Sequence, residues 1–324
     1  MATMNAAVVS SFERPPQYGR FAVPVPREDG QELVDVLAAG LHPRVRSGAR
    51  GAHYTSTGTL PMVPGVDGVG RRADGALVYF VADDDATGTM AEKALLDPRR
   101  AIELPDGVDV AAVAAAMNPA MSSWVALRRR TTLMPGQAVL VLGATGNAGA
   151  MAVQVARRLG AGRVLAAGRD ATRLQQLSAL GADEIVRLRD GEDAERGDSD
   201  LAAVAAEVDV VIDYLWGEPA RRAMLALLTA RADRSRPLDW VQIGAVAGPT
   251  LELPSAALRS ANLRIQGSGQ GSVGPATYLA ELPSLVAEIE RGTFDVRTRT
   301  VALAEVESAW EAPVDRGERI VFVP

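Results

Sequence analysis

Hydrophobic and polar positions alternate in regular blocks through the second half of the chain. Short runs of six to eight residues with adjacent apolar side chains are followed by longer stretches in which apolar residues recur three or four positions apart. The first pattern predicts buried strands and the second predicts amphipathic helices. Strands are expected at 137–143, 163–168, 183–188, 208–215, 238–245 and 263–268, and helices at 149–160, 171–181 and 218–230. Strands separated by a helix pair in parallel through right-handed crossovers, so this half predicts a doubly wound parallel sheet.

Two segments depart from this alternation. Residues 189–200 are rich in Asp, Glu and Gly and are expected to form a solvated loop. Residues 109–130 are interpreted as two helices that break at Asn118-Pro119, because proline cannot continue a helix and restricts the residue before it. Ser122 or Ser123 would then cap the second of these helices.

The first third of the chain has a different pattern, in which short extended runs are separated by turns that contain Gly and Pro. This pattern predicts a compact, largely antiparallel lobe. The runs cover residues 5–12, 31–40, 65–72, 75–80 and 89–96. Near the end of the chain a helix is expected at 276–292, and the final run 318–324 is expected to return to the first lobe. The pattern therefore predicts two lobes, which a length of 324 residues allows.

The apolar segment 138–156 could be a membrane span, a core helix or a ligand-binding loop. Its nineteen residues carry no charge, but three glycines, Thr145 and Asn147 lie near its middle and would weaken a membrane helix. Split at the glycines, the segment is a strand, a sharp turn and a helix, and residues 144–149 match G-x-G-x-x-G with alanine in the first place. The residues expected to bind a dinucleotide here are Gly143, Thr145, Gly146, Asn147, Ala148 and Gly149.

Two glycines of this loop have distinct expected roles. Gly146 would let the backbone approach a pyrophosphate, and Gly149 would let the helix close on the strand. The N-terminus of the helix would face the negative charge of the phosphates. A tight strand-to-helix turn that binds nothing can have the same pattern, but the strands and helices that follow favour a dinucleotide site.

The end of the next strand predicts which dinucleotide binds. An NAD site places a carboxylate there, whereas this chain has Gly168, Arg169 and, one helical turn later, Arg173. A guanidinium suits the 2′-phosphate of NADPH, so NADPH is predicted rather than NADH. Asp170 is interpreted as the N-cap of the following helix. If its carboxylate faced the ribose instead, the prediction would shift back toward NADH as the coenzyme. The alternative for Arg173 is a solvated helix face.

Charge and composition argue against several other classes of protein. The net charge of −6 argues against a nucleic-acid partner, which requires a basic surface. The chain has no cysteine and only two histidines, His42 and His53, so no disulfide and no metal site are expected. The first twenty residues lack the charged flank and apolar core of a secretory signal, and we expect a cytoplasmic protein that does not bind a membrane.

Four segments, in order, resemble motifs of one family. Residues 60–70 (LPMVPGVDGVG) resemble its P-G-x-[DE]-G-x-G segment, and residues 88–96 (GTMAEKALL) resemble its domain-linking strand. Residues 115–127 resemble the helix that enters its cofactor domain, and residues 139–149 resemble its nucleotide loop. Over nearly its whole length the chain resembles the medium-chain dehydrogenase/reductase superfamily, in its zinc-free, quinone oxidoreductase-like branch.

The resemblance implies an α/β fold with two domains. A mostly β, GroES-like catalytic domain would be built from residues 1–118 and 268–324. A Rossmann domain that binds NADP would be inserted at residues 119–267. The active site would lie in the cleft between the two domains.

The resemblance also implies metal-independent hydride transfer from NADPH to a quinone or an α,β-unsaturated carbonyl. Negative charge would develop on the substrate oxygen and would need a hydroxyl, imidazole or backbone donor. His42 occupies the position of an asparagine that lies near the nicotinamide in many relatives, and Tyr54 is the other candidate donor. Alternatively, His42 is an ordinary histidine beside Pro43 whose hydrogen bonds are satisfied, and Tyr54 packs over the rim of the cleft. His53 is expected at the surface.

Further cofactor contacts are implied outside the glycine loop. These are Ser122, Leu215, Gly244, Ala245, Gly267 and Ser268. Ser122 matches a threonine of the family and would bond the cofactor near its nicotinamide. The loop at Gly267 would cross the bound cofactor, although a flexible linker is also compatible with its sequence. Asp67 matches a family acid and is expected to have a structural role.

Two classes of function are therefore compatible with the sequence. The first is an NADPH-dependent quinone or enone reductase. The second is a catalytically weak NADPH-binding redox sensor or structural protein of the same fold, which the altered region around His42 keeps open. A zinc alcohol dehydrogenase is disfavoured by the absence of cysteine. Relatives commonly dimerise through the strand that corresponds to 263–268, so a homodimer is expected.

Overall fold

The chain forms two compact units, which we call unit 1 and unit 2. Unit 1 comprises Met1–Asn118 and Pro275–Pro324, and unit 2 comprises Pro119–Gly274. The structure, a computed structural model, describes residues 2–28, 30–53, 55–82, 86–269, 271–314 and 317–324. The domain boundaries expected from the sequence lie at 118/119 and 267/268; in the structure the chain enters unit 2 at Pro119 and returns to unit 1 at Pro275. The loop that follows 263–268 therefore belongs to unit 2.

Unit 2 contains a six-stranded parallel sheet with the order β10-β9-β8-β11-β12-β13. Its strands are β8 (Ala138–Leu142), β9 (Arg163–Gly168), β10 (Glu184–Arg187), β11 (Val210–Asp213), β12 (Leu238–Gln242) and β13 (Leu263–Gly267). The order reverses between β8 and β11, so the sheet has two halves that run outward from its centre. The expected doubly wound parallel sheet is confirmed, because each predicted strand is present and each neighbour pair is parallel.

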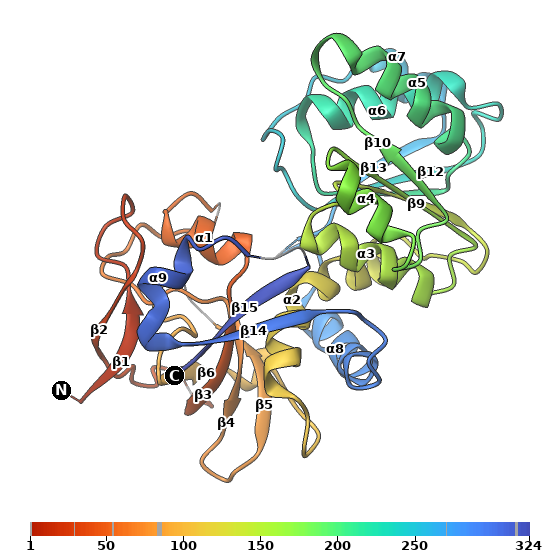
Figure 1. Cartoon of the computed structure of the whole chain (residues 1–324). Coiled ribbons are helices and arrows are strands. Elements are labelled where there is room, and N and C mark those ends of the chain that lie inside the picture. The colour runs from red at the N-terminus through yellow and green to blue at the C-terminus, as the bar shows by residue number, and fades with distance from the viewer. Residues whose placement is uncertain (1, 29, 54, 83–85, 270, 315–316) are drawn as a thin grey trace. The chain divides into compact units, whose positions relative to one another are not determined.

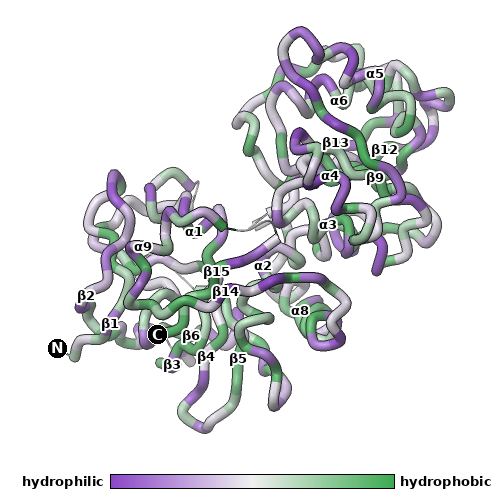
Figure 2. Tube along the Cα trace, viewed as in Figure 1, coloured by the Kyte–Doolittle hydropathy of each residue, from purple (hydrophilic) through white to green (hydrophobic). Residues whose placement is uncertain are grey.

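Helices cover both faces of this sheet (Figure 1). One face carries α3 (Asn147–Arg158) and α4 (Ala171–Leu177); the other carries α5 (Ala194–Ala205), α6 (Gly217–Ala230) and α7 (Ser255–Ser260). The central strands β8, β9 and β11 are apolar and buried over most of their length, as β9 shows in Figure 2, because both of their faces are covered. Leu140, Leu165 and Trp240 pack with residues of α5 and α6 in the core of the unit.

Helix α5 was not predicted from the sequence. Residues 189–200, expected as a solvated loop, form the 3₁₀ turn η3 (Gly191–Asp193) and the first half of α5. The buried residues of α5 are Gly197, Leu201 and Ala205, so its apolar stripe becomes evident only after residue 200. Glu195 lies in the first turn of the helix, where it interacts favourably with the helix dipole.

Residues 110–130 correct a second prediction. The expected break at Asn118-Pro119 is absent, and α2 (Val110–Val125) continues through Pro119 into the π-turn η2 (Ala126–Arg130). Apolar residues are buried on both sides of the proline, and we infer that this packing outweighs the one hydrogen bond that proline cannot make. The N-cap is Asp109, whose Oδ1 accepts from the amides of Ala111 and Ala112 at 3.0 Å, rather than Ser122 or Ser123.

Among the described residues, Val110–Arg130 is the one helical stretch long and apolar enough to cross a membrane. Its most apolar window is 72% buried inside the protein. Packing thus accounts for the apolar composition of this helix. The segment 138–156, which also has an apolar composition, divides into β8, the glycine loop and α3.

Unit 1 contains a two-stranded sheet, β1-β2, and a seven-stranded sheet in which β14, β15, β3, β4, β5 and β7 are neighbours in that order and β6 pairs with β3. The strands are β1 (Thr3–Val8), β2 (Gln17–Ala22), β3 (Glu32–Gly40), β4 (Asp67–Arg71), β5 (Leu77–Val81), β6 (Lys93–Leu96), β7 (Ala101–Glu103), β14 (Arg297–Ala302) and β15 (Glu318–Val323). Its helices and 3₁₀ turns are α1 (Pro43–Ala49), η1 (Pro98–Arg100), α8 (Pro275–Glu290), η4 (Leu303–Glu305) and α9 (Val306–Trp310). Most pairs are antiparallel, and β15 pairs with β3, so the final strand returns to the first lobe as expected.

Candidate functional site

The loop between β8 and α3 is fixed by backbone hydrogen bonds. Gly143 has a φ of 82°, which lets the chain turn sharply after β8. The amides of Gly143 and Ala144 donate to the carbonyl of Ala167 on β9 at 2.9 and 3.0 Å. Gly146 is the N-cap of α3, and no side chain caps this helix end. The twelve-residue helix α3 therefore begins without a side-chain cap. This leaves space for an anion at its first turn.

The two glycines of the fingerprint meet different surroundings. A Cβ at residue 149 would lie 2.3 Å from the carbonyl oxygen of Gly143 and 2.6 Å from the Cα of Ala144. A Cβ at residue 146 would meet the same carbonyl oxygen at 3.5 Å, an ordinary contact. Gly149 is therefore required for α3 to close on β8, whereas Gly146 leaves open space beside the backbone.

The end of β9 adjoins this loop. A Cβ at Gly168 would lie 2.6 Å from the side chain of Thr145, so the two chain segments are in close contact. Arg173 reaches back from α4 and donates from Nη1 to the carbonyl oxygen of Thr145 at 2.9 Å. Arg169 is 75% exposed and its guanidinium is 3.7 Å from the carboxylate of Asp190. Two guanidinium groups therefore stand at this end of β9, and Arg173 does not simply lie on a solvated helix face.

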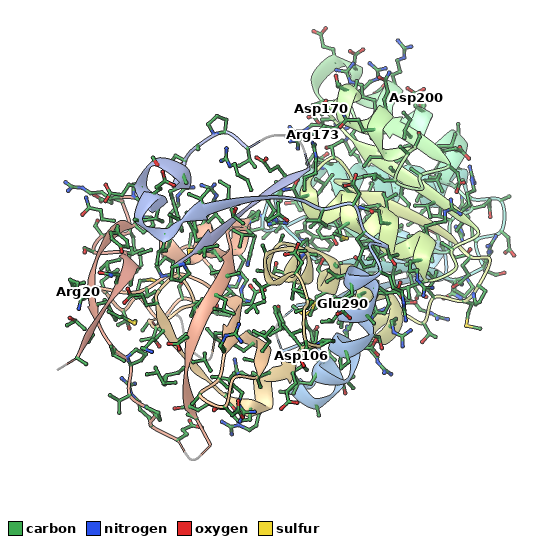
Figure 3. The ribbon with its side chains drawn as sticks, turned by 60° about the horizontal axis from the view of Figure 1, so that its bottom comes forward. Arg20, Asp106, Asp170, Arg173, Asp200 and Glu290 are labelled. Atoms are coloured by element: carbon green, nitrogen blue, oxygen red, sulfur yellow. The ribbon has the colours of Figure 1, made fainter. Side chains whose placement is uncertain are left out.

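Asp170 is the N-cap of α4, as its position predicts. Its Oδ1 accepts from the backbone amide of Arg173 at 3.0 Å. Figure 3 shows Asp170 and Arg173 next to one another at this end of the helix. The carboxylate thus accepts from one amide of the first helical turn, and its Oδ2 lies 4.0 Å from Nε of Arg173.

The end of β11 is organised by Asp213, a role that the sequence did not reveal. The carboxylate is fully buried; Oδ1 accepts from the amides of Leu215 and Trp216 at 2.8 and 3.0 Å, and Oδ2 accepts from Trp240 Nε1 at 2.9 Å. Burial raises the pKa of this carboxyl, although the three donors oppose that shift. Trp216 has a φ of 52°, so Asp213 holds a strained turn at the edge of the sheet.

This turn lies against the glycine loop. A Cβ at Gly143 would be 3.0 Å from the Leu215 side chain, and a Cβ at Gly244 would be 2.8 Å from the Tyr214 carbonyl oxygen. The ends of β8, β11 and β12 therefore meet at one edge. Next to them, Ser268 donates its amide to the carbonyl of Gln242, the last residue of β12, at 2.8 Å. The structure thus places Gly143, Leu215, Gly244, Ala245, Gly267 and Ser268 along the carboxyl-terminal edge of one sheet.

Ser122 has hydrogen-bond partners inside unit 2. Its Oγ lies 2.9 Å from the carbonyl oxygen of Pro119 and 2.8 Å from the hydroxyl of Tyr214. Burial raises the pKa of Tyr214 to about 12, so this phenol stays protonated. The sequence gives no sign of this pair, because the two residues are 92 positions apart.

Unit 1 holds a buried polar cluster of His42, Asp67 and Tyr79. His42 Nε2 lies 3.0 Å from Asp67 Oδ1, and the hydroxyl of Tyr79 donates to Oδ2 of the same carboxylate at 2.7 Å. A carboxylate only accepts, so the imidazole donates from Nε2 and the lone pair of a neutral ring lies on Nδ1. The exposed fraction of His42 is 3%. Asp67 thus has the structural role that the sequence indicated.

Burial lowers the pKa of His42 and outweighs the opposing effect of Asp67. The positive charges of Arg319 and Arg44 act in the same direction as burial. Burial thus favours the neutral ring of His42, which in this arrangement donates from Nε2 to Asp67; its part in the chemistry stays a prediction. Tyr54, the other candidate donor, lies outside the described residues. His53 is partly buried, and its Nδ1 lies 2.8 Å from Thr55 Oγ1.

Among the described residues, no group of three or more His, Asp and Glu side chains is arranged to hold a metal ion. The chain has no cysteine that could add a ligand.

Comparison with known proteins places the chain in a family. The model of a zinc-binding dehydrogenase domain matches residues 148–288. A probable NADPH-dependent quinone reductase from Emericella nidulans is 31% identical, with 99% of this chain and 100% of the relative covered. The chain belongs to the medium-chain dehydrogenase/reductase family, in its quinone oxidoreductase-like branch.

Solved structures agree with this assignment over the whole chain. The quinone oxidoreductase from Thermus thermophilus, whose complex with NADPH is also known, has a TM-score of 0.79 and 27% identity, with 99% of this chain and 100% of that chain covered. A putative NADPH:quinone reductase from Bacillus thuringiensis has a TM-score of 0.80 at 19% identity, covers both chains completely and supports the fold.

Substitution of the two glycines tests their separate roles in this quinone oxidoreductase-like chain. G149A forces a Cβ into the backbone of the loop, so we expect it to lower the free energy of unfolding by about 2–4 kcal/mol. G146A adds a methyl group in open space at a helix N-cap and should cost within about 1 kcal/mol. Chemical unfolding of both variants checks this difference. Equal losses would contradict the roles assigned to the two glycines.

The lowered pKa of His42 predicts a dependence of stability on pH. The unfolded chain takes up a proton near the ordinary pKa of 6.5, while the folded chain does so only at lower pH, so stability falls as the pH drops through 6.5. We expect H42N to lose less of its thermal midpoint than the wild type between about pH 7.5 and pH 5.5. H53N gives a graded comparison, because burial also lowers the pKa of His53 but this residue is less buried, so its effect should have the same sign and a smaller size. An identical loss in H42N and wild type would show that the pKa of His42 is the same in the folded and unfolded chains.

Proposed function

We propose that this chain is an NADPH-dependent oxidoreductase that reduces a quinone or an α,β-unsaturated carbonyl by hydride transfer without a metal ion. The observation that carries the proposal is the loop at Gly146–Gly149, at which α3 begins. Two arginines lie beside this loop at the end of β9. The names of the relatives support it: one is a probable NADPH-dependent quinone reductase, and another is an NADPH-dependent alkenal/one oxidoreductase from Arabidopsis thaliana.

The residues of unit 2 fit a phosphorylated dinucleotide. The open space at Gly146 and the uncapped start of α3 suit a diphosphate, since backbone amides and the helix dipole both favour negative charge. Arg169 and Arg173 suit the 2′-phosphate that distinguishes NADPH from NADH. Asp170 caps α4 and lies 4.0 Å from Nε of Arg173; in the proposal it keeps this role, and the two guanidinium groups set the coenzyme preference.

The chemistry divides between cofactor and protein. NADPH, when bound, supplies the hydride, and the substrate oxygen then gains negative charge and a proton. In the proposal, Asp67 keeps His42 in the tautomer that leaves Nδ1 as an acceptor for a hydroxyl of the substrate or cofactor. Tyr54 is the proposed proton donor. We propose that Ser122, fixed by Tyr214, contacts the nicotinamide end of the cofactor.

We further propose that the enzyme is a cytoplasmic homodimer. Support for a dimer comes from β13, which is an edge strand of the sheet. Its Ile265 is 37% exposed. A second copy that pairs with this strand would satisfy the free backbone groups of the edge and cover an apolar side chain.

Oxidation of NADPH tests the proposed activity. The purified protein is mixed with NADPH and a panel of quinones and enones, and the loss of NADPH absorbance is followed. We expect turnover with at least one class of acceptor. Binding of NADPH without turnover for any acceptor would favour the redox sensor or structural protein instead.

Replacement of Arg169 and Arg173 by alanine tests the coenzyme preference. R169A and R173A remove donors for a 2′-phosphate, so each should raise the KM for NADPH about tenfold and the double variant further, with little change for NADH. R259A removes an exposed arginine of α7 and is the matched control. The ratio of kcat/KM for the two coenzymes is the measurement. An unchanged ratio in the double variant would contradict the assignment of NADPH to these arginines.

A further inference from the structure

Arg130, the last residue of η2, holds both ends of the loop that follows β13. Its Nε donates to the carbonyl oxygen of Gly267 at 2.8 Å, and its Nη1 donates to the carbonyl oxygen of Ser272 at 3.1 Å. The two acceptors lie at either end of the segment 267–272. One guanidinium therefore bonds to the chain at two positions after β13, and we call the described residues there, 267–269 and 271–272, the Arg130 loop.

The Arg130 loop is tied by further hydrogen bonds. The hydroxyl of Ser272 accepts from the amide of Gly269 at 2.9 Å and donates to the carbonyl oxygen of the same residue at 2.7 Å. The amide of Ser268 donates to the carbonyl of Gln242 at the end of β12. A flexible linker would not have these bonds, so the glycine-rich composition of the segment does not make it a linker.

The position of the Arg130 loop on the sheet indicates what it faces. Gly267 ends β13 opposite Gln242, the last residue of β12. Ligands of doubly wound sheets bind beyond the carboxyl ends of the strands, with one mononucleotide on each half of the sheet. The half β8-β9-β10 carries the glycine loop and the two arginines proposed for the 2′-phosphate. The half β11-β12-β13, with the Arg130 loop, is then the side of the nicotinamide.

We propose that Arg130 is a positioning residue for the nicotinamide half of NADPH, which acts by holding the Arg130 loop in its binding conformation. The inference rests on the proposed function, because it takes NADPH as the ligand. Holding the loop in the free protein removes the entropy cost of ordering it during binding. Arginine suits this task because its fork reaches two carbonyls at once, whereas a lysine ammonium is a single point of charge.

Binding of two different ligands tests the two halves of the proposed site separately. NADPH contains both mononucleotides, and 2′,5′-ADP contains only the adenosine half with its 2′-phosphate. In R130M, which keeps the side-chain stem and removes the donors, we expect the Kd for NADPH to rise about tenfold, because the competent loop is populated less. The Kd for 2′,5′-ADP should stay unchanged. R130K should fall between R130M and the wild type, and the KM for NADPH should rise more than kcat falls.

R264M is the matched control. Arg264 lies on β13, the strand that the Arg130 loop follows; its side chain is 59% exposed and its guanidinium is 3.8 Å from the carboxylate of Asp239, so R264M removes the same charge without removing a bond to the loop. We expect R264M to bind both ligands like the wild type. Thermal unfolding of each variant is measured in parallel, and R130K carries the comparison if R130M does not fold.

The outcomes are distinguishable. Unchanged NADPH binding in R130M, or an equal loss of NADPH and 2′,5′-ADP binding, would overturn the role of Arg130 alone, since both show that the loop has no specific relation to the nicotinamide half. A wild-type protein that binds neither ligand would overturn the proposed function, and the inference with it.

Discussion

The contact between α3 and the end of β8 is the constraint on which the site of unit 2 depends. Because residue 149 has no Cβ, the helix begins directly against the carbonyl of Gly143. That approach aims the first helix turn at the edge of the sheet where the ends of β11 and β12 also meet. A displacement of α3 by the width of a methyl group would move the positive end of its dipole away from the ends of β11 and β12. The fold and the proposed anion site thus depend on the same contact.

The sequence predicted the sheet of unit 2 well because its pattern is local. Each strand is a short apolar run and each helix a longer periodic one, so the parallel order followed from connection rules alone. The prediction from sequence failed at α2 and α5, for opposite reasons. Pro119 is a strong local signal that burial along the whole helix outweighs, and residues 189–200 lack an apolar stripe because the buried face of α5 emerges only near its end.

The side-chain partners in the site were beyond sequence reasoning, because they are distant in the chain. Ser122 and Tyr214 are 92 positions apart, Asp213 and Trp240 are 27 apart, and His42 and Asp67 are 25 apart. The sequence identified His42 as a residue of interest but not its protonation. Only the bond from Nε2 to a carboxylate shared with Tyr79 shows that the neutral ring presents an acceptor.

Several guanidinium groups of unit 2 bind backbone carbonyls in addition to carboxylates. Arg173 donates to Thr145, Arg130 donates to Gly267 and Ser272, and the buried Arg231 donates to carbonyls on two loops. A carbonyl acceptor fixes the guanidinium without neutralising it, whereas a carboxylate would cancel its charge. Arginines held in this way can order loops and still leave positive potential for an anionic ligand. At the edge of the sheet, the groups that shape the loops therefore also favour a dinucleotide with an additional phosphate.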